Sequence, residues 1–211
     1  VHKLAIATNE NILIALSSDE QNALYVHQYF VSGAKRLQSA WHKWTFGTSS
    51  TDKILNIDFI ENTLFIINQR SDGVYLETMD ISPAYVDTGA SYLTHLDRKV
   101  SNTTTGVSSS FNSSTNRTTV TIPYAITNTM KIVGKSGGSN TAGQSLATVS
   151  QTGTSIVVSG DITSNSFFIG EQYEFEFVFS QQFMQIADTQ GSRISVKEGR
   201  LQIRNWNVSF N

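Results

Sequence analysis

Short stretches of alternating apolar and polar residues recur along the chain, and Gly, Asn, Ser and Thr separate them. This alternation predicts β-strands, because successive side chains of a strand point to opposite faces of a sheet. Few segments keep the period of a helix. Short turns between the strands predict antiparallel meanders. In the first 85 residues the predicted strands are Ile12–Leu16, Leu24–Val31, Leu37–Phe46, Ile54–Ile60, Leu64–Asn68 and Val74–Ile81.

The segment Ala23–Phe46 carries the clearest local signal. Two aromatic-rich runs flank a Ser-Gly turn, which predicts a β-hairpin. A weaker copy follows about 50 residues later, where Asn11–Ile14 and Leu24–Val26 recur as Asn62–Phe65 and Val74–Leu76. A repeat of this length built from short strands favours incomplete blades of a β-propeller. Two unrelated hairpins are the alternative.

The amino-acid composition of the sequence changes after residue 85. Residues 101–116 are almost entirely Ser, Thr, Asn and Gly, which predicts a long surface loop or a mobile linker. A second strand-rich region follows, typical of a β-sandwich or barrel. Its predicted strands are Thr118–Pro123, Met130–Val133, Ser145–Val149, Ser155–Val158, Tyr173–Phe179 and Arg200–Phe210.

We therefore expect an all-β chain in three parts: a blade-like antiparallel meander (1–85), a connector with a Ser/Thr/Asn-rich loop (86–116), and a sandwich-like region (117–211). In Tyr173–Phe179 four aromatic residues share one face and two glutamates the other. In Arg200–Phe210 the phase of the alternation changes, which predicts a β-bulge or a strand that passes back to the first part.

Composition narrows the function classes. The chain has 15 Lys and Arg against 17 Asp and Glu, a net charge of −2, so it has no basic footprint for nucleic acid or anionic membranes. It has no cysteine, which excludes disulfides and thiolate metal sites. No apolar run approaches the roughly 18 residues of a membrane-spanning helix. The start at Val1, inside a strand-like pattern, predicts an internal fragment or a processed product.

Three motifs with known chemistry are better explained by structure. Gly134-Lys135-Ser136 resembles the end of a phosphate-binding loop, but Thr129 stands where that motif needs glycine, so we interpret it as a turn. Glu174 and Glu176 have a spacing of roughly 6.5–7 Å on a strand, as in paired catalytic carboxylates. We interpret them as a solvated strand face. None of the histidines forms a local metal-binding pair; they are His2, His27, His42 and His95.

Histidines and aromatic residues gather on the Ala23–Phe46 hairpin. We expect His27 and His42 to form a polar pair across it. The aromatic set is interpreted as core or interface anchors, with a sugar-stacking platform as the alternative; it comprises Tyr25, Tyr29, Trp41, Trp44 and Phe46. Glycosylation triplets are expected by chance in so Ser/Thr-rich a chain; they occur at Asn102, Asn112, Asn116 and Asn207. No catalytic, cofactor-binding or metal-ligating residue is predicted.

A series of motifs, in order along most of the chain, resembles the tail tubular protein B (nozzle) family of T7-type short-tailed bacteriophages. The middle of the chain, 101–161, matches by texture only. The motifs are Leu24–Phe30, Gln38–Phe46, Leu93–Asp97, Phe168–Ser180 and Gly199–Trp206. Family members are several times longer, so the resemblance implies an internal or C-terminal fragment.

The resemblance implies a structural protein of the virion rather than an enzyme. It implies a homo-oligomeric ring of six copies below the tail adaptor, in contact with tail fibres and open to the DNA during ejection; the fragment alone is either monomeric or oligomeric. A chain of net charge −2 suits a DNA conduit better than a DNA binder, because a basic wall would hold DNA through counterion release. The alternatives are a carbohydrate-binding module and a tail-associated glycan hydrolase acting on the host surface.

Overall fold

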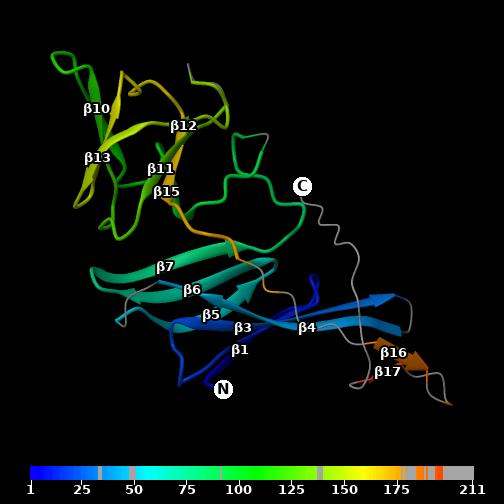
Figure 1. Cartoon of the computed structure of the whole chain (residues 1–211). Helices are drawn as coiled ribbons and strands as arrows, with labels where there is room; N and C mark the ends of the chain where they lie inside the picture. Colours follow the sequence, from blue (N-terminus) through cyan, green and yellow to red (C-terminus); the bar gives the residue numbers. More distant parts are fainter. Residues whose placement is uncertain are drawn as a thin grey trace. The chain divides into compact units, whose positions relative to one another are not determined.

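The computed structural model describes residues 1–32, 35–47, 51–90, 92–136, 140–176, 178, 184–187, 189 and 193–196. Within these ranges the protein is all-β: it contains no helix, all strand pairs are antiparallel, and none of the sheets closes into a barrel (Figure 1). The chain divides into two compact units, Val1–Tyr173 and Glu174–Asn211, which are described separately. The all-β prediction is confirmed.

Two sheets occupy the first 80 residues (Figure 1). The first sheet has the order β1-β2-β3-β4 and the second the order β5-β6-β7. All six strands predicted here are confirmed within a few residues, and β1 is an addition. The strands are β1 (Lys3–Ala7), β2 (Ile12–Leu16), β3 (Ala23–Ser32), β4 (Lys35–Thr45), β5 (Lys53–Ile60), β6 (Thr63–Arg70) and β7 (Gly73–Asp80).

One apolar core joins these two sheets. The alternation of β2 and β3 points Ile14, Leu16 and Leu24 into it, and the second sheet contributes Leu64 and Ile66. Each of these side chains is fully buried, and such burial contributes about 1.5–3 kcal/mol per side chain. We call this cluster the first core.

The 50-residue repeat is visible in the strands, with a different unit from the predicted one. Strands β1–β3 correspond to β5–β7 at an offset of about 50 residues, whereas β4 has no counterpart in the second copy. The turns at Asn11 and Glu61 occupy equivalent places, and both residues have φ of 54°. Strand β1 was not predicted because its buried residues, Ala5 and Ala7, are small and give a weak apolar signal.

Two further sheets complete the first unit, in the orders β13-β14-β10-β9 and β12-β11-β15-β8. Both contribute to a second core, with Val120 and Ile156 from the former and Ile132 and Ile169 from the latter. The strands are β8 (Asp97–Ser101), β9 (Ser108–Asn112), β10 (Arg117–Thr121), β11 (Met130–Gly134), β12 (Ser145–Leu146), β13 (Thr148–Thr152), β14 (Ser155–Ser159) and β15 (Phe167–Glu171).

The structure differs from the sequence analysis at three places in this region. The polar stretch 101–116 is not a loop throughout, because Ser108–Asn112 forms β9 and pairs with β10. The predicted strand Ser145–Val149 is two strands in different sheets, β12 and β13. Strand β15 was missed because all five of its residues are buried, so it lacks the alternation of a half-exposed strand.

The strand predicted at Tyr173–Phe179 is wrong where the structure describes it. Residues 172–176 form no strand, and Phe175 is 82% exposed. The last strand before this segment is β15, and its pairing with β11 ends at Glu171. The second unit contains a hairpin that was not predicted, β16 (Met184–Ala187) and β17 (Arg193–Val196). The predicted strand Arg200–Phe210 lies outside the described residues, and the three-part division remains a prediction.

Candidate functional site

The β3–β4 hairpin presents a continuous row of aromatic and polar side chains on one face. Tyr25, His27 and Tyr29 alternate along β3 and therefore share a face. Their direct partners on β4 are Lys43, Trp41 and Ser39 respectively. We call these six residues the hairpin aromatic face.

Ring contacts and hydrogen bonds order this face. The ring centroids of His27 and Trp41 are 4.8 Å apart, those of His27 and Tyr29 6.0 Å. His27 Nε2 lies 2.8 Å from Ser39 Oγ. Trp41 nevertheless remains 60% exposed. Exposed, ordered aromatic rings with polar edges are characteristic of protein-contact surfaces.

A carboxylate holds one end of the face. Tyr25 Oη donates a hydrogen bond of 2.5 Å to Glu20, and Lys43 Nζ donates to the other carboxylate oxygen. The Lys43 contact, followed by that of Tyr25, lowers the pKa of Glu20 below its ordinary value. The same contacts with Glu20 raise the pKa values of Lys43 and Tyr25. At neutral pH this end therefore carries a paired positive and negative charge.

Trp41 and Trp44 cannot form a sugar-stacking pair. Trp41 faces His27, whereas Trp44 faces Leu24, so the two indoles lie on opposite faces of the hairpin. Trp44 packs against the first core, and Phe46 belongs to it. Trp44 and Phe46 are thus the anchors that the sequence predicted, and Trp41 is a surface residue. The predicted pair of His27 and His42 is wrong for the same reason, because His42 faces Val26.

The remaining sequence candidates do not assemble into a reaction centre. Glu174 and Glu176 are exposed and lie outside any strand, so the strand spacing that suggested a carboxylate pair does not apply. Lys135 follows the end of β11, and its ammonium group lies 4.6 Å from the Phe168 ring centroid. His2 and His95 are exposed. In the described ranges no group of three His, Asp or Glu residues could hold a metal ion. The same ranges contain no helix able to cross a membrane.

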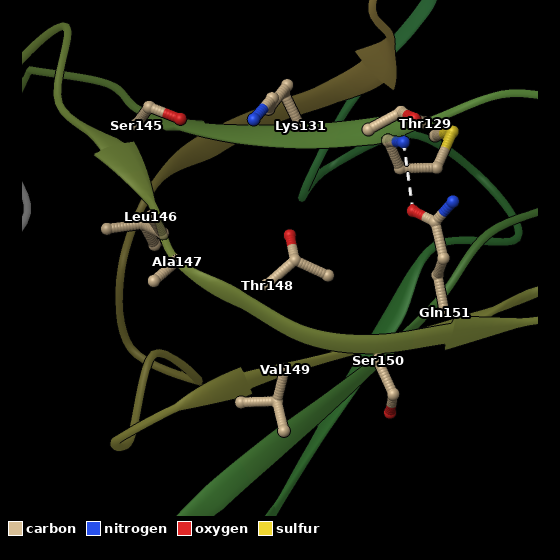
Figure 2. Close-up of a pocket in the computed structure, with 10 residues that line it drawn as sticks. Thr129, Lys131, Ser145, Leu146, Ala147, Thr148, Val149, Ser150 and Gln151 are labelled. Atoms are coloured by element: carbon tan, nitrogen blue, oxygen red, sulfur yellow. Dashed lines mark hydrogen bonds between the residues drawn. The ribbon is translucent and has the colours of Figure 1, made fainter.

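A depression lies where the chain crosses between the two sheets around the second core (Figure 2). Its volume is 470 Å³, and residues of β11, β12 and β13 line it. Gln151 joins the two sheets there, since its Oε1 accepts a hydrogen bond of 2.9 Å from Met130 N and its Nε2 donates to Asn128 O. Apart from Lys131, the lining side chains are neutral.

A buried ionic cluster, which sequence reasoning missed, is the strongest electrostatic feature. Arg70 donates two hydrogen bonds to Glu77, of 2.8 and 3.1 Å, and both side chains are largely buried. Asp97, Arg98 and Glu171 lie on β8 and β15 beside this pair. Burial raises the pKa of Asp97 above its ordinary value. The negative charges of Glu77 and Glu171 also raise this pKa, whereas the positive charge of Arg70 lowers it.

A second buried carboxylate, Asp87, fixes the connector before β8. It accepts hydrogen bonds of 2.8 Å from Thr94 N and 2.5 Å from Lys99 Nζ. Burial alone would raise the pKa of Asp87, but these contacts bring it below the ordinary value. The residue is therefore a charged structural anchor.

The described residues thus form an all-β protein with an aromatic hairpin face and a buried ionic cluster. A family model described as bacteriophage nozzle protein matches residues 1–211, so the chain belongs to the bacteriophage nozzle protein family. The resemblance predicted from the sequence is thereby confirmed. The chain is a structural component of the phage tail and is located in the virion. A comparison with curated proteins gave no match.

Proposed function

We propose that this chain forms part of the wall of the tail channel through which phage DNA is ejected, and that it docks other tail proteins. In the parent protein, six copies form a ring that contacts the tail adaptor and the tail fibres. The chain performs this role without catalysis and without sequence-specific DNA binding.

The observation that carries the proposal is the lack of a net positive charge. The net charge is −2, and ion pairs already engage several described basic side chains. These are Lys3, Lys43, Arg70, Arg98 and Lys99. A DNA-binding surface would offer such groups to phosphates and release counterions. A channel wall must let DNA slide, which a weakly charged polar surface permits.

The sheet arrangement supports a finer architecture, which we also propose. Sheets β1–β4 and β5–β7 share a repeat with equivalent left-handed turns at Asn11 and Glu61, as blades of a propeller do. The two four-stranded sheets on the second core correspond to a sandwich. The hairpin aromatic face is the docking surface that we propose for another tail protein, because its Trp41 ring is exposed and contacts the ring of His27.

Electron cryomicroscopy of the intact phage particle tests the location. The expected result is a six-fold ring in which density for this chain borders the channel. A matched particle that carries Trp41→Ala is expected to assemble with reduced occupancy of whichever protein covers the hairpin aromatic face. Density for the chain away from the channel would contradict the conduit, and full occupancy in the variant would contradict the docking surface.

DNA affinity provides a second test on the chain itself. We expect binding to duplex DNA at physiological salt to be weaker than the usual non-specific range, Kd about 10⁻⁴–10⁻⁶ M. The variant Glu174→Lys/Glu176→Lys serves as a positive control, since it raises the net charge from −2 to +2 by two charges per substitution. Tight, steeply salt-dependent binding by the unaltered chain would overturn the proposal.

A further inference from the structure

The two apolar cores of the first unit share no residue. The first core takes its buried side chains from residues 5–66 and the second from residues 120–169. What connects them includes a set of charged and aromatic side chains that we call the joint. On one side it comprises Arg70, Asp72, Tyr75 and Glu77 of β6, β7 and their turn; on the other it comprises Asp97, Arg98, Tyr124 and Glu171.

Arg98 is the centre of the joint. Its guanidinium carbon lies 4.9 Å from the ring centroid of Tyr75 and 4.0 Å from that of Tyr124, one ring from each side. Its Nε lies 4.0 Å from Glu77 Oε1 and its Nη1 lies 3.5 Å from Glu171 Oε1. The Arg98 side chain is only 3% exposed. One desolvated cation therefore contacts both halves, and water screens these interactions little.

The backbone at Arg98 is held as firmly as its side chain. Its φ is 48°, the left-handed region that residues other than glycine seldom occupy. Tyr124 Oη donates a hydrogen bond of 2.6 Å to Arg98 O, and Arg98 N donates to Asp97 Oδ1 at 3.0 Å. These contacts fix the direction in which the arginine leaves β8 and enters the joint.

Asp72 makes a second connection across the joint. Its Oδ2 accepts hydrogen bonds of 2.8 Å from Ala125 N and from Tyr75 Oη, and lies 3.9 Å from Arg98 Nη2. Ala125 belongs to the half that contains the second core. The contacts across the joint thus include one hydrogen bond and two ion pairs, together with the Tyr75 ring, which packs against the second core. Each core itself is held by apolar packing.

We propose that the joint is a hinge. The contacts of Arg98 hold the two halves of Val1–Tyr173 in one orientation, and the halves rotate relative to each other as rigid bodies when these contacts break. Buried ion pairs lose their stability abruptly once one partner leaves, because the other charge remains desolvated. Of the residues that form the two cores, only Tyr124 takes part in those contacts, so both cores stay intact. The tail protein would thereby have a defined place at which it bends.

Distance measurements by electron paramagnetic resonance test the hinge in the whole 211-residue chain. The chain has no native cysteine, so Thr78→Cys on β7 and Ser110→Cys on β9 introduce the only two labelling sites. Both positions are exposed. We expect a narrow distance distribution in this parent, a broad one after Arg98→Met, and a narrow one after Arg117→Met, which removes an exposed arginine from β10.

Hydrogen exchange distinguishes a hinge from general unfolding. In Arg98→Met we expect amides near the joint, in β7 and β8, to exchange at least about a hundredfold faster. This factor corresponds to the loss of stability that breaking a buried ion pair causes. Amides of Ile14 and Ile132, in the two cores, should keep their protection. A narrow distance distribution in Arg98→Met would overturn the proposal, as would loss of protection in both cores together.

A milder variant covers the case in which Arg98→Met does not fold. Asp72→Asn keeps an oxygen that accepts from Ala125 N but removes the charge beside Arg98. The expected result is a distance distribution broader than that of the parent, with both cores protected. An unchanged distribution in Asp72→Asn would then overturn the hinge.

Discussion

The hairpin aromatic face and the joint use the same kinds of residue in equivalent places of the repeat, but in different surroundings. Tyr25 on β3 and Tyr75 on β7 stand 50 positions apart, and each donates its hydroxyl to a nearby carboxylate, Glu20 or Asp72. Around Tyr25 the charges are exposed to solvent. Around Tyr75 they lie beside Arg98, whose side chain is almost completely covered.

Burial decides what such a cluster does. An ion pair in water gains little, because solvent and salt screen it and ordering two long side chains costs entropy. A buried pair is barely screened, and the loss of one partner leaves a charge without water or counterion. We therefore expect substitutions in the joint to change stability, and substitutions on the hairpin aromatic face to change contacts with partners.

The largest effect is expected for Glu77→Ala. This change leaves Arg70 without its bidentate partner and removes one of the carboxylates around Arg98. The free energy of unfolding should fall by about 3–5 kcal/mol, measured by urea denaturation. Glu77→Gln retains an acceptor for Arg70 and should lose less. If Glu77→Ala lowers the free energy of unfolding by less than about 1 kcal/mol, as the loss of a surface ion pair does, burial does not distinguish the joint from the hairpin aromatic face.

The two tryptophans of the hairpin give the next contrast. Trp44→Ala should lower the free energy of unfolding by about 2–3 kcal/mol, since the half-buried indole packs against the first core. Trp41→Ala should change it by no more than about 0.5 kcal/mol, as exposed positions usually do. Thermal and urea denaturation of both variants measure the difference. Equal losses would mean that Trp41 is a packing residue and that the hairpin aromatic face is not a free surface.

A smaller, pH-dependent effect is expected for Asp97→Asn. Burial raises the pKa of Asp97 in the folded protein, so ionisation of this carboxyl costs stability at neutral pH. The asparagine retains an acceptor for Arg98 N and removes that cost, so the variant should be more stable than the parent at pH 7. Its advantage should shrink as the pH falls through the raised pKa of Asp97 and level off below about 3.9, the usual pKa of an aspartate.

Urea denaturation of parent and variant at a series of pH values measures this effect. A variant less stable than the parent at pH 7 would show that the Asp97 charge supports Arg70 and Arg98 more than burial penalises it. The positive and negative charges of the joint would then compensate one another. Burial alone would no longer explain the difference in stability between the joint and the exposed pair of Glu20 and Lys43.

Sequence reasoning predicted the first two sheets well and the later ones less well, for a physical reason. Strands such as β2 and β6 bury one face, so alternation reveals them. Strand β15 is buried on both faces and gives no alternation, whereas Tyr173–Phe179 alternates but finds no partner strand in its described part. A pattern reports which residues suit a strand, and pairing depends on segments far away in the sequence.

The same limit applies to the sites. Alternation alone places Trp41 and Trp44 on opposite faces, because three positions separate them, so the failure of the sugar platform was predictable. The joint was not. Arg70, Arg98 and Glu171 lie in segments distant along the chain, and each resembles an ordinary surface charge until the fold brings the segments together. No local signal distinguishes a buried arginine from an exposed one.

The smallest effect is expected for Glu20→Gln, at the end of the hairpin aromatic face. The glutamine loses the negative charge beside Lys43 and Tyr25, so the raised pKa of Lys43 should fall back toward its ordinary value, which nuclear magnetic resonance titration measures. The free energy of unfolding should stay within experimental error, because all three groups are accessible to water. Glu77→Gln, the same substitution in the joint, is the matched comparison. If both variants lose the same stability, burial does not separate the two clusters, and the hairpin aromatic face is held as rigidly as the joint.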